Sequence, residues 1–170
     1  MPDDIKTHSR ALLTPYVVSK KSAEKIQSAR ILVRLALENS DLYPSHRRKI
    51  ISDAIWYVTE SDGKWKTRFK SKQVLYLAKN EPNSLVRINH EHVFTRKAFV
   101  DEILRRHEEL LADMSELDKL LGIAVGCIVT KPEHDSLVNG SGWARYAGTV
   151  EVYDTSEIPP RLFQFPLLGS

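Results

Sequence analysis

The sequence predicts an α+β fold that is mostly helical, with a small antiparallel sheet. Most of the chain carries apolar residues three or four positions apart, which is the spacing of amphipathic helices. Two short stretches differ, SLVRINH at residues 84–90 and IAVGCIVT at residues 123–130, because their apolar and β-branched residues are typical of strands. A chain of 170 residues is long enough for one substantial core and a small helical extension.

The composition is that of a globular protein. Hydrophobic residues make up 42% of the chain and charged residues 28%, and no apolar run is long enough to cross a bilayer. The first residues carry acids where an export signal would carry bases. The single cysteine, Cys127, cannot form an internal disulfide. We therefore expect a cytoplasmic protein with no membrane-inserted segment.

Two helices are expected before residue 63. They follow an irregular arm at residues 1–18. The stretch 19–38 starts with serines that can cap a helix and has a wide apolar stripe, which favours burial on several sides or a homodimer through the helix at 20–38. The stretch 45–59 has a second apolar stripe. The two helices form a helical extension at 19–62, and a second domain is expected at 63–170.

The second helix begins with three cations, Arg47, Arg48 and Lys49. Cations at a helix N-terminus oppose the macrodipole, where acids are normally favoured. The pattern therefore indicates either an anionic ligand at this point or pairing with nearby acids.

A regular charge pattern follows between residues 64 and 72, where every second residue is basic. In an extended chain alternate side chains share one face, so the pattern predicts a ribbon with one cationic, solvent-facing side. That side suits a nucleic-acid backbone, or alternatively protects an edge strand from aggregation. The residues are Lys64, Lys66, Arg68, Lys70 and Lys72.

Histidines and acids gather at the ends of both predicted strands. His90, Glu91 and His92 end the first strand, and His134 begins a short helix that Thr130 can cap after the second. Imidazole and carboxylate groups suit a divalent ion or proton transfer. The alternative is that one histidine binds the backbone and another is simply exposed.

The stretches EHVFTRK at residues 91–97 and IAVGCIVTKPEHDSL at residues 123–137 resemble the HNH nucleases, the ββα-metal or His-Me finger class. The resemblance covers about residues 85–137 and implies a ββα-metal-like core. In that class an acid–His pair closes the first strand and the helix supplies a further ligand. It implies Glu91 as a metal ligand, His92 as the general base, His134 as the helix-borne ligand and His90 as a spare ligand.

The sequence departs from the family pattern in three respects. Glu91 stands where the family usually has Asp, the frequent cysteine pairs are absent, and a helical insertion at 96–121 separates the two halves. The first difference bears on the geometry of the metal, since Glu reaches further than Asp. The last requires that the strand pair form around a substantial insertion.

The resemblance implies a metal-dependent endonuclease that hydrolyses nucleic-acid phosphodiester bonds, DNA before RNA, in a restriction, toxin or defence role. The implied ion is Mg²⁺ or Mn²⁺, with Zn²⁺ and Ni²⁺ as further options. Arg145 is expected to clamp a phosphate through paired N–H groups, or else to form a surface ion pair. The alternative function is a non-catalytic nucleic-acid-binding, regulatory or oligomerisation module that retains an HNH-like scaffold.

Overall fold

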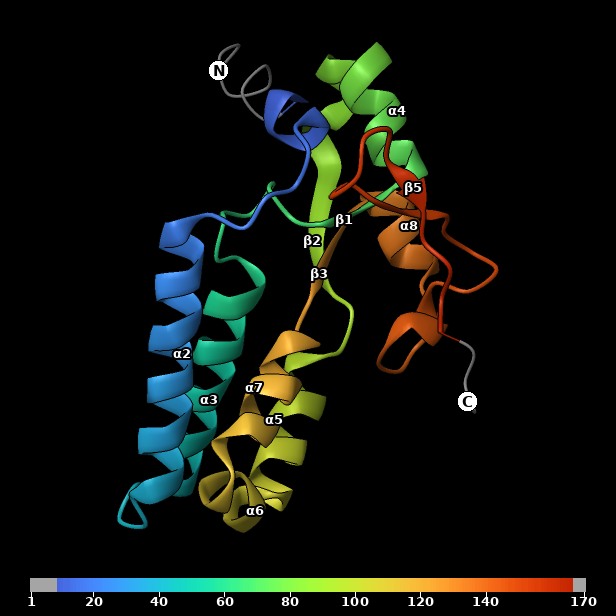
Figure 1. Cartoon of the computed structure of the whole chain (residues 1–170). Helices are drawn as coiled ribbons and strands as arrows, with labels where there is room; N and C mark the ends of the chain where they lie inside the picture. Colours follow the sequence, from blue (N-terminus) through green and yellow to red (C-terminus); the bar gives the residue numbers. More distant parts are fainter. Residues whose placement is uncertain (1–8, 167–170) are drawn as a thin grey trace. The chain divides into compact units, whose positions relative to one another are not determined.

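The computed structural model describes residues 9–166, apart from the side chains at positions 86 and 87. The chain divides into two compact units, each made of separate segments (Figure 1). Unit 1 contains residues up to 17, residues 63–93 and residues from 126 onward, and unit 2 contains residues 18–62 and 94–125. The predicted α+β class is confirmed, since helices and one five-stranded sheet make up the described fold.

Part of the arm predicted at residues 1–18 lies outside the described residues. Within the described part, residues 9–13 are helical. Leu12 is buried in the core of unit 1, and Ser9 Oγ donates a hydrogen bond to the carbonyl of Ala78 at 2.6 Å. These residues therefore belong to the packed part of unit 1.

The sheet of unit 1 is mixed, with strand order β2-β3-β1-β4-β5. Strand β1 is parallel to β3, whereas the other pairs are antiparallel. The sequence predicted an antiparallel sheet, and the difference arises because the buried strand β1 lies in the middle, next to β3. The strands are β1 (Phe69–Ser71), β2 (Ile88–His92), β3 (Gly126–Thr130), β4 (Val152–Asp154) and β5 (Arg161–Leu162).

Strands β2 and β3 form the antiparallel pair that the sequence predicted. Their register runs from Ile88 opposite Thr130 to His92 opposite Gly126. Strand β2 is shorter than predicted, because residues Pro82–Arg87 form the 3₁₀ helix η1 instead of extending the strand. The pair joins residues 88–92 to residues 126–130, which are separated in the chain by the second segment of unit 2, residues 94–125.

Three further helical segments of unit 1 pack on the sheet or carry residues of the candidate site. They are α4 (Lys72–Asn80), α8 (Lys131–Ser136) and the 3₁₀ helix η2 (Trp143–Arg145). Ser71 caps α4 by accepting a hydrogen bond from the backbone N–H of Val74 at 3.1 Å. Val74 and Ala78 of α4 then pack with Ile128 of β3 in one apolar cluster. The sheet is thereby covered on the side of Ile128.

Unit 2 is a helical bundle with its own core. Its helices are α2 (Lys20–Glu38), α3 (Pro44–Thr59), α5 (Arg96–Arg105), α6 (His107–Ala112) and α7 (Met114–Gly122). Ser19 caps α2, as the sequence predicted, and Thr95 caps α5. Val33, Ile55 and Ile103 are fully buried in one shared cluster, so the predicted extension and the predicted insertion fold together. The helical insertion expected at 96–121 consists of α5, α6 and α7, with a break at Arg106 between the first two.

Gly126 is required by a close contact on the sheet. A Cβ placed on Gly126 would lie 2.3 Å from Nε2 of His90, well inside van der Waals contact. We predict that Gly126→Ala lowers the free energy of unfolding by about 1–3 kcal/mol, the usual cost of overpacking. Urea unfolding followed by circular dichroism measures the change.

Gly122 supplies the matched control, because a Cβ added there meets nothing within 4 Å. Gly122→Ala should leave the free energy of unfolding unchanged or raise it by up to about 1 kcal/mol. In the double variant Gly126→Ala/His90→Ala the ring is gone, so most of the loss caused by the added methyl should disappear. A loss of the same size with and without the ring would contradict this contact.

Candidate functional site

The candidate site of unit 1 is centred on Glu91 and His134. The antiparallel pairing of β2 and β3 places Glu91 opposite Cys127, and α8 begins directly after β3. His134 of α8 thus reaches back to β2, and its Nδ1 lies 2.5 Å from Oε2 of Glu91. Glu91 is mostly buried, with 15% of its side chain exposed, whereas 38% of His134 is exposed. The imidazole therefore joins a buried carboxylate to the surface.

Helix α8 is held at its start by a network around Glu133. Thr130 is its N-cap, and Oε2 of Glu133 accepts a hydrogen bond from the Thr130 backbone N–H at 2.8 Å, which completes a capping box. The same carboxylate oxygen accepts a hydrogen bond from Ser71 Oγ at 2.7 Å. Because Ser71 also caps α4, one acid ties two helix starts to the sheet and fixes the position of His134.

Arg145 is the third member of the site. The backbone N–H of Gly142 donates to the carbonyl of Val93 at 2.8 Å, which brings the start of η2 to the end of β2. Gly142 has φ of 89°, a conformation that favours glycine. Arg145 then places Nη1 3.4 Å from Glu91 Oε1 and donates to the carbonyl of His92 at 3.2 Å. The guanidinium is thus positioned against the carboxylate in an ion pair whose side chains are only 12% and 15% exposed, whereas the predicted alternative to a phosphate clamp was an ion pair on the surface.

His90 and His92 lie on the opposite face of β2 from Glu91. Successive side chains of a strand point to opposite faces, and the centroids of the two imidazole rings are 5.5 Å apart. A Cβ on Gly126, opposite His92 in the register, would strike His90, so all three positions share one face. The structure brings Glu91, His134 and Arg145 together, and it does not bring His92 or His90 to them.

Two buried groups beneath the site were not singled out as site residues. Cys127, opposite Glu91, is fully buried, and Tyr146 follows Arg145 directly. Burial, with a smaller contribution from the charge of Glu91, raises the pKa of both the Cys127 thiol and the Tyr146 hydroxyl. Both groups are therefore neutral beside Glu91. No pattern in the sequence indicates that Tyr146 lies next to the site.

Glu91 and His134 would give a divalent ion two protein ligands. Two ligands of one ion about 2.1 Å from the metal lie roughly 3 Å apart, so the 2.5 Å separation needs only a small rotation. Carboxylate and imidazole together suit Mn²⁺, Zn²⁺ or Ni²⁺, while Mg²⁺ would need more oxygen ligands. No group of three or more His, Cys, Asp or Glu side chains is gathered for an ion within residues 9–166. Water or substrate would therefore supply the remaining ligands.

The predicted cationic ribbon does not form one exposed face. Lys70 lies in the central strand β1 and is 1% exposed, with Nζ donating to Thr155 Oγ1 at 3.2 Å. The expectation that Lys70 faces solvent is wrong, because β1 has a neighbouring strand on each side and packed faces. The same position rules out the alternative of a protected edge strand.

The remaining ribbon cations fall into two groups. Arg68 pairs with Asp154 at 2.6 Å, and Lys72 pairs with Glu151 at 2.7 Å. Burial alone would raise the pKa of Asp154, but hydrogen bonds from Arg68 and Ser156 outweigh it and lower that pKa to about 2. Lys64 and Lys66 are exposed, and Lys64 Nζ lies 4.7 Å from the centre of the Trp65 ring. Arg68 and Lys72, although paired, keep side chains that are 50% and 66% exposed, so Lys70 is the ribbon cation that is withdrawn from solvent.

The three cations at the start of α3 have partners inside unit 2. Arg47 donates to the carbonyls of Asn39 and Ser40, at the end of α2. Arg48 pairs with Asp101, and Lys49 pairs with Asp53 at 2.9 Å. The structure therefore favours the alternative of local pairing over an anionic ligand.

Comparisons with protein-family models, with curated proteins and with solved structures found no match to the chain. The site is thus described from its own geometry. None of the helices among the described residues is both long enough and apolar enough to cross a membrane.

Arg145 should stabilise the protein through Glu91, because the guanidinium and the carboxylate balance each other's charge in a mostly buried site. We predict that Arg145→Met lowers the free energy of unfolding by about 1–3 kcal/mol. Glu91→Gln should cost less in the Arg145→Met background than in the wild type, with a coupling energy of about 0.5–3 kcal/mol in a double-mutant cycle.

Arg105→Met is the matched control, since Arg105 pairs with Glu102 on the exposed surface of α5. This change should alter the free energy of unfolding by less than about 1 kcal/mol. Additive effects of Arg145→Met and Glu91→Gln would show that the two side chains do not depend on each other.

Lys70 should reveal its burial through the pH dependence of stability. Burial lowers the pKa of Lys70 from 10.5 to about 8, so between these values the folded state binds fewer protons than the unfolded state. The free energy of unfolding should therefore rise with pH across this window, by up to about 3 kcal/mol.

Lys70→Met removes this titration and should raise the free energy of unfolding by about 1–3 kcal/mol at neutral pH. The difference between wild type and Lys70→Met should then shrink as the pH rises from 8 to 10.5. Urea titrations at several pH values measure it, and a difference that is constant across the window would contradict a desolvated ammonium.

Proposed function

We propose that the chain is a metal-dependent nuclease that hydrolyses nucleic-acid phosphodiester bonds at Glu91, His134 and Arg145. The observation that supports this best is the β2–β3–α8 unit, in which a strand pair and the following helix bring His134 to Glu91. The expected ββα arrangement is thus present in the chain order that the resemblance to HNH nucleases implies. The separation of the two halves by residues 94–125 leaves this pairing intact.

Glu91 and His134 would hold the ion, which when bound polarises a phosphate and lowers the pKa of a bound water. Arg145 lies against Oε1 of Glu91, so Oε2 is the oxygen left for the ion. The guanidinium holds the carboxylate in place and balances its charge. The Glu133 network keeps α8, and with it the His134 ring, in a fixed position.

His92 does not take the part of the general base in this proposal. It lies on the face of β2 opposite Glu91 and is 9% exposed. Its contribution to the site is its backbone carbonyl, which accepts a hydrogen bond from Arg145 at 3.2 Å. The imidazole of His92 belongs to the packing of the other face, together with His90.

A non-catalytic nucleic-acid-binding module is the second candidate. It is favoured by the direct contacts of Glu91 with both His134 and Arg145, which hold the carboxylate without an ion. The exposed cations Lys64 and Lys66 would then contact the phosphate backbone without cleavage. The cleavage assay below separates the two candidates.

We place the proposed nuclease in the cytoplasm, because the one cysteine of the chain is buried and free. DNA is the first substrate to test and RNA the second. A role in restriction, as a toxin or in defence is the context in which a small nuclease of this kind would act.

The nuclease proposal is tested by incubating plasmid DNA and RNA with Mg²⁺, Mn²⁺, Zn²⁺, Ni²⁺ or chelator. We expect cleavage with at least one ion and none with chelator. Glu91→Gln and His134→Ala should each reduce the rate at least about 100-fold, because each removes a ligand. His92→Ala should retain most of the activity, and unfolding curves for all variants identify any loss caused by misfolding.

The outcomes distinguish the proposals. Absence of cleavage with every ion, together with a mobility shift of the nucleic acid, would favour the binding module. Cleavage that survives both Glu91→Gln and His134→Ala would contradict this site. Loss of cleavage in folded His92→Ala would show that catalysis uses the other face of β2.

A further inference from the structure

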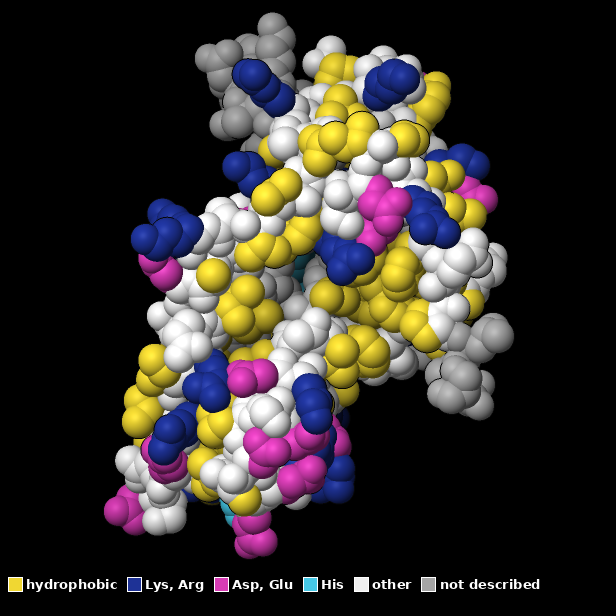
Figure 2. Space-filling view, in the orientation of Figure 1, with side chains coloured by type: hydrophobic (Ala, Val, Ile, Leu, Met, Phe, Trp, Pro, Cys, Tyr) yellow, Lys and Arg dark blue, Asp and Glu magenta, His cyan; other side chains and the backbone are white. Residues whose placement is uncertain are grey.

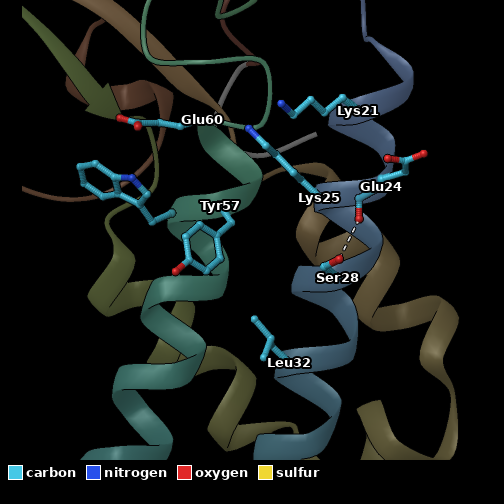
Figure 3. Close-up of a pocket in the computed structure, with 8 residues that line it drawn as sticks. Lys21, Glu24, Lys25, Ser28, Leu32, Tyr57 and Glu60 are labelled. Carbon is cyan, nitrogen blue, oxygen red and sulfur yellow. Dashed lines mark hydrogen bonds between the residues drawn. The ribbon is translucent and has the colours of Figure 1, made fainter.

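Helices α2 and α3 of unit 2 enclose a groove that runs along most of their length. Two hollows of about 650 and about 620 Å³ follow each other in it, and both are lined by Leu32. Figure 3 shows Leu32 and Lys25 reaching from α2 toward α3, with Tyr57 on α3. The 19 residues of α2 span about 28 Å, so the groove is long enough to receive another helix.

The surface beside the groove is apolar. Ile31 is 47% exposed, Leu35 56% and Tyr57 49%. Helix α2 already buries Ala29, Val33 and Ala36 in the core of unit 2, so its apolar residues extend over a second side. Figure 2 shows hydrophobic side chains among charged ones over α2 and α3. Such a face on a surface helix is typical of an interaction site.

Two lysines that line the groove lie before Leu32 in the chain, and two of the acids that line it lie after Leu32 at similar distances. Lys25 lies seven residues before Leu32 and Glu38 six residues after it. Lys21 lies eleven residues before and Asp41 nine residues after. A helix that lay antiparallel to α2, centred on Leu32, would therefore need acids opposite the lysines and lysines opposite the acids.

We infer that this groove is a self-association surface, in which α2 of a second copy of the chain lies antiparallel to α2 about a two-fold axis near Leu32. A two-fold interface uses the same patch on both copies, so it must be complementary to itself. The groove meets this condition, because a two-fold rotation about an axis near Leu32 places Lys21 near Asp41 of the partner and Lys25 near Glu38 of the partner. Ile31 and Leu35 then come together at the centre of the interface.

The other charges of the groove are compatible with this arrangement. Glu24 lies eight residues before Leu32, opposite the neutral Ser40. Glu60 is carried by α3, at the same end as Lys21 and Lys25. Lys25 Nζ already donates to the Ser61 carbonyl of its own chain at 3.0 Å, and Glu38 is paired with Arg34 on its own helix. Lys21 and Asp41 of the partner are therefore the ionic contact on which the arrangement depends most.

Sedimentation velocity and light scattering over a wide range of protein concentration test the inference. We expect the full chain of 19.4 kDa to associate reversibly into a species of twice that mass. Leu35→Glu places a carboxylate at the apolar centre and should raise the dissociation constant at least about tenfold. Ile123→Glu is the matched control, because Ile123 is exposed to a similar extent, 50% against 56% for Leu35, but lies outside the groove.

A charge exchange tests the antiparallel arrangement itself. Lys21→Glu sets two acids against each other at both ends of the interface, and Asp41→Lys sets two lysines there, so each single variant should associate more weakly. The double variant Lys21→Glu/Asp41→Lys restores opposite charges and should recover the wild-type dissociation constant. A wild-type chain that stays monomeric at all concentrations overturns the inference, as does a double variant no tighter than the singles.

Discussion

The antiparallel ladder between β2 and β3 is the interaction on which the candidate site depends. It places Glu91 opposite Cys127 and sets the point at which β3 ends and α8 begins. A shift of the register by one residue would turn Glu91 to the other face and bring an imidazole to His134 instead. The close contact of His90 with Gly126 holds this register, since the ring fits only over a residue without a side chain.

Local signals in the sequence predicted much of the fold. Ser19 and Thr130 cap the helices that they were expected to cap, because a capping hydroxyl acts on the N–H groups of its own helix. The strand pair and the approach of His134 to Glu91 were also predicted, and the structure confirms the pairing. These features depend on residues near each other in the chain or on one pairing of two apolar runs.

Features that depend on the neighbours of a strand were not predictable. Alternating cations at residues 64–72 indicate one charged face, but only Phe69–Ser71 form a strand, and the sheet surrounds Lys70 on both sides. In the same way, the convergence of His92 with Glu91 needed a strand end, whereas the ladder continues to His92 and separates the two side chains. Tyr146 joins the site through tertiary packing alone.

The division of each unit into separate segments determines when each can form. The first segment of unit 2 ends at residue 62, and its core needs Ile103 and Leu117 from the segment that follows β2. The sheet of unit 1 in turn requires β3, which follows those helices in the chain. During synthesis, all residues of the helical bundle therefore emerge before β3 does. Closure of the bundle brings the ends of residues 94–125 together and shortens the effective loop that β2 and β3 must close.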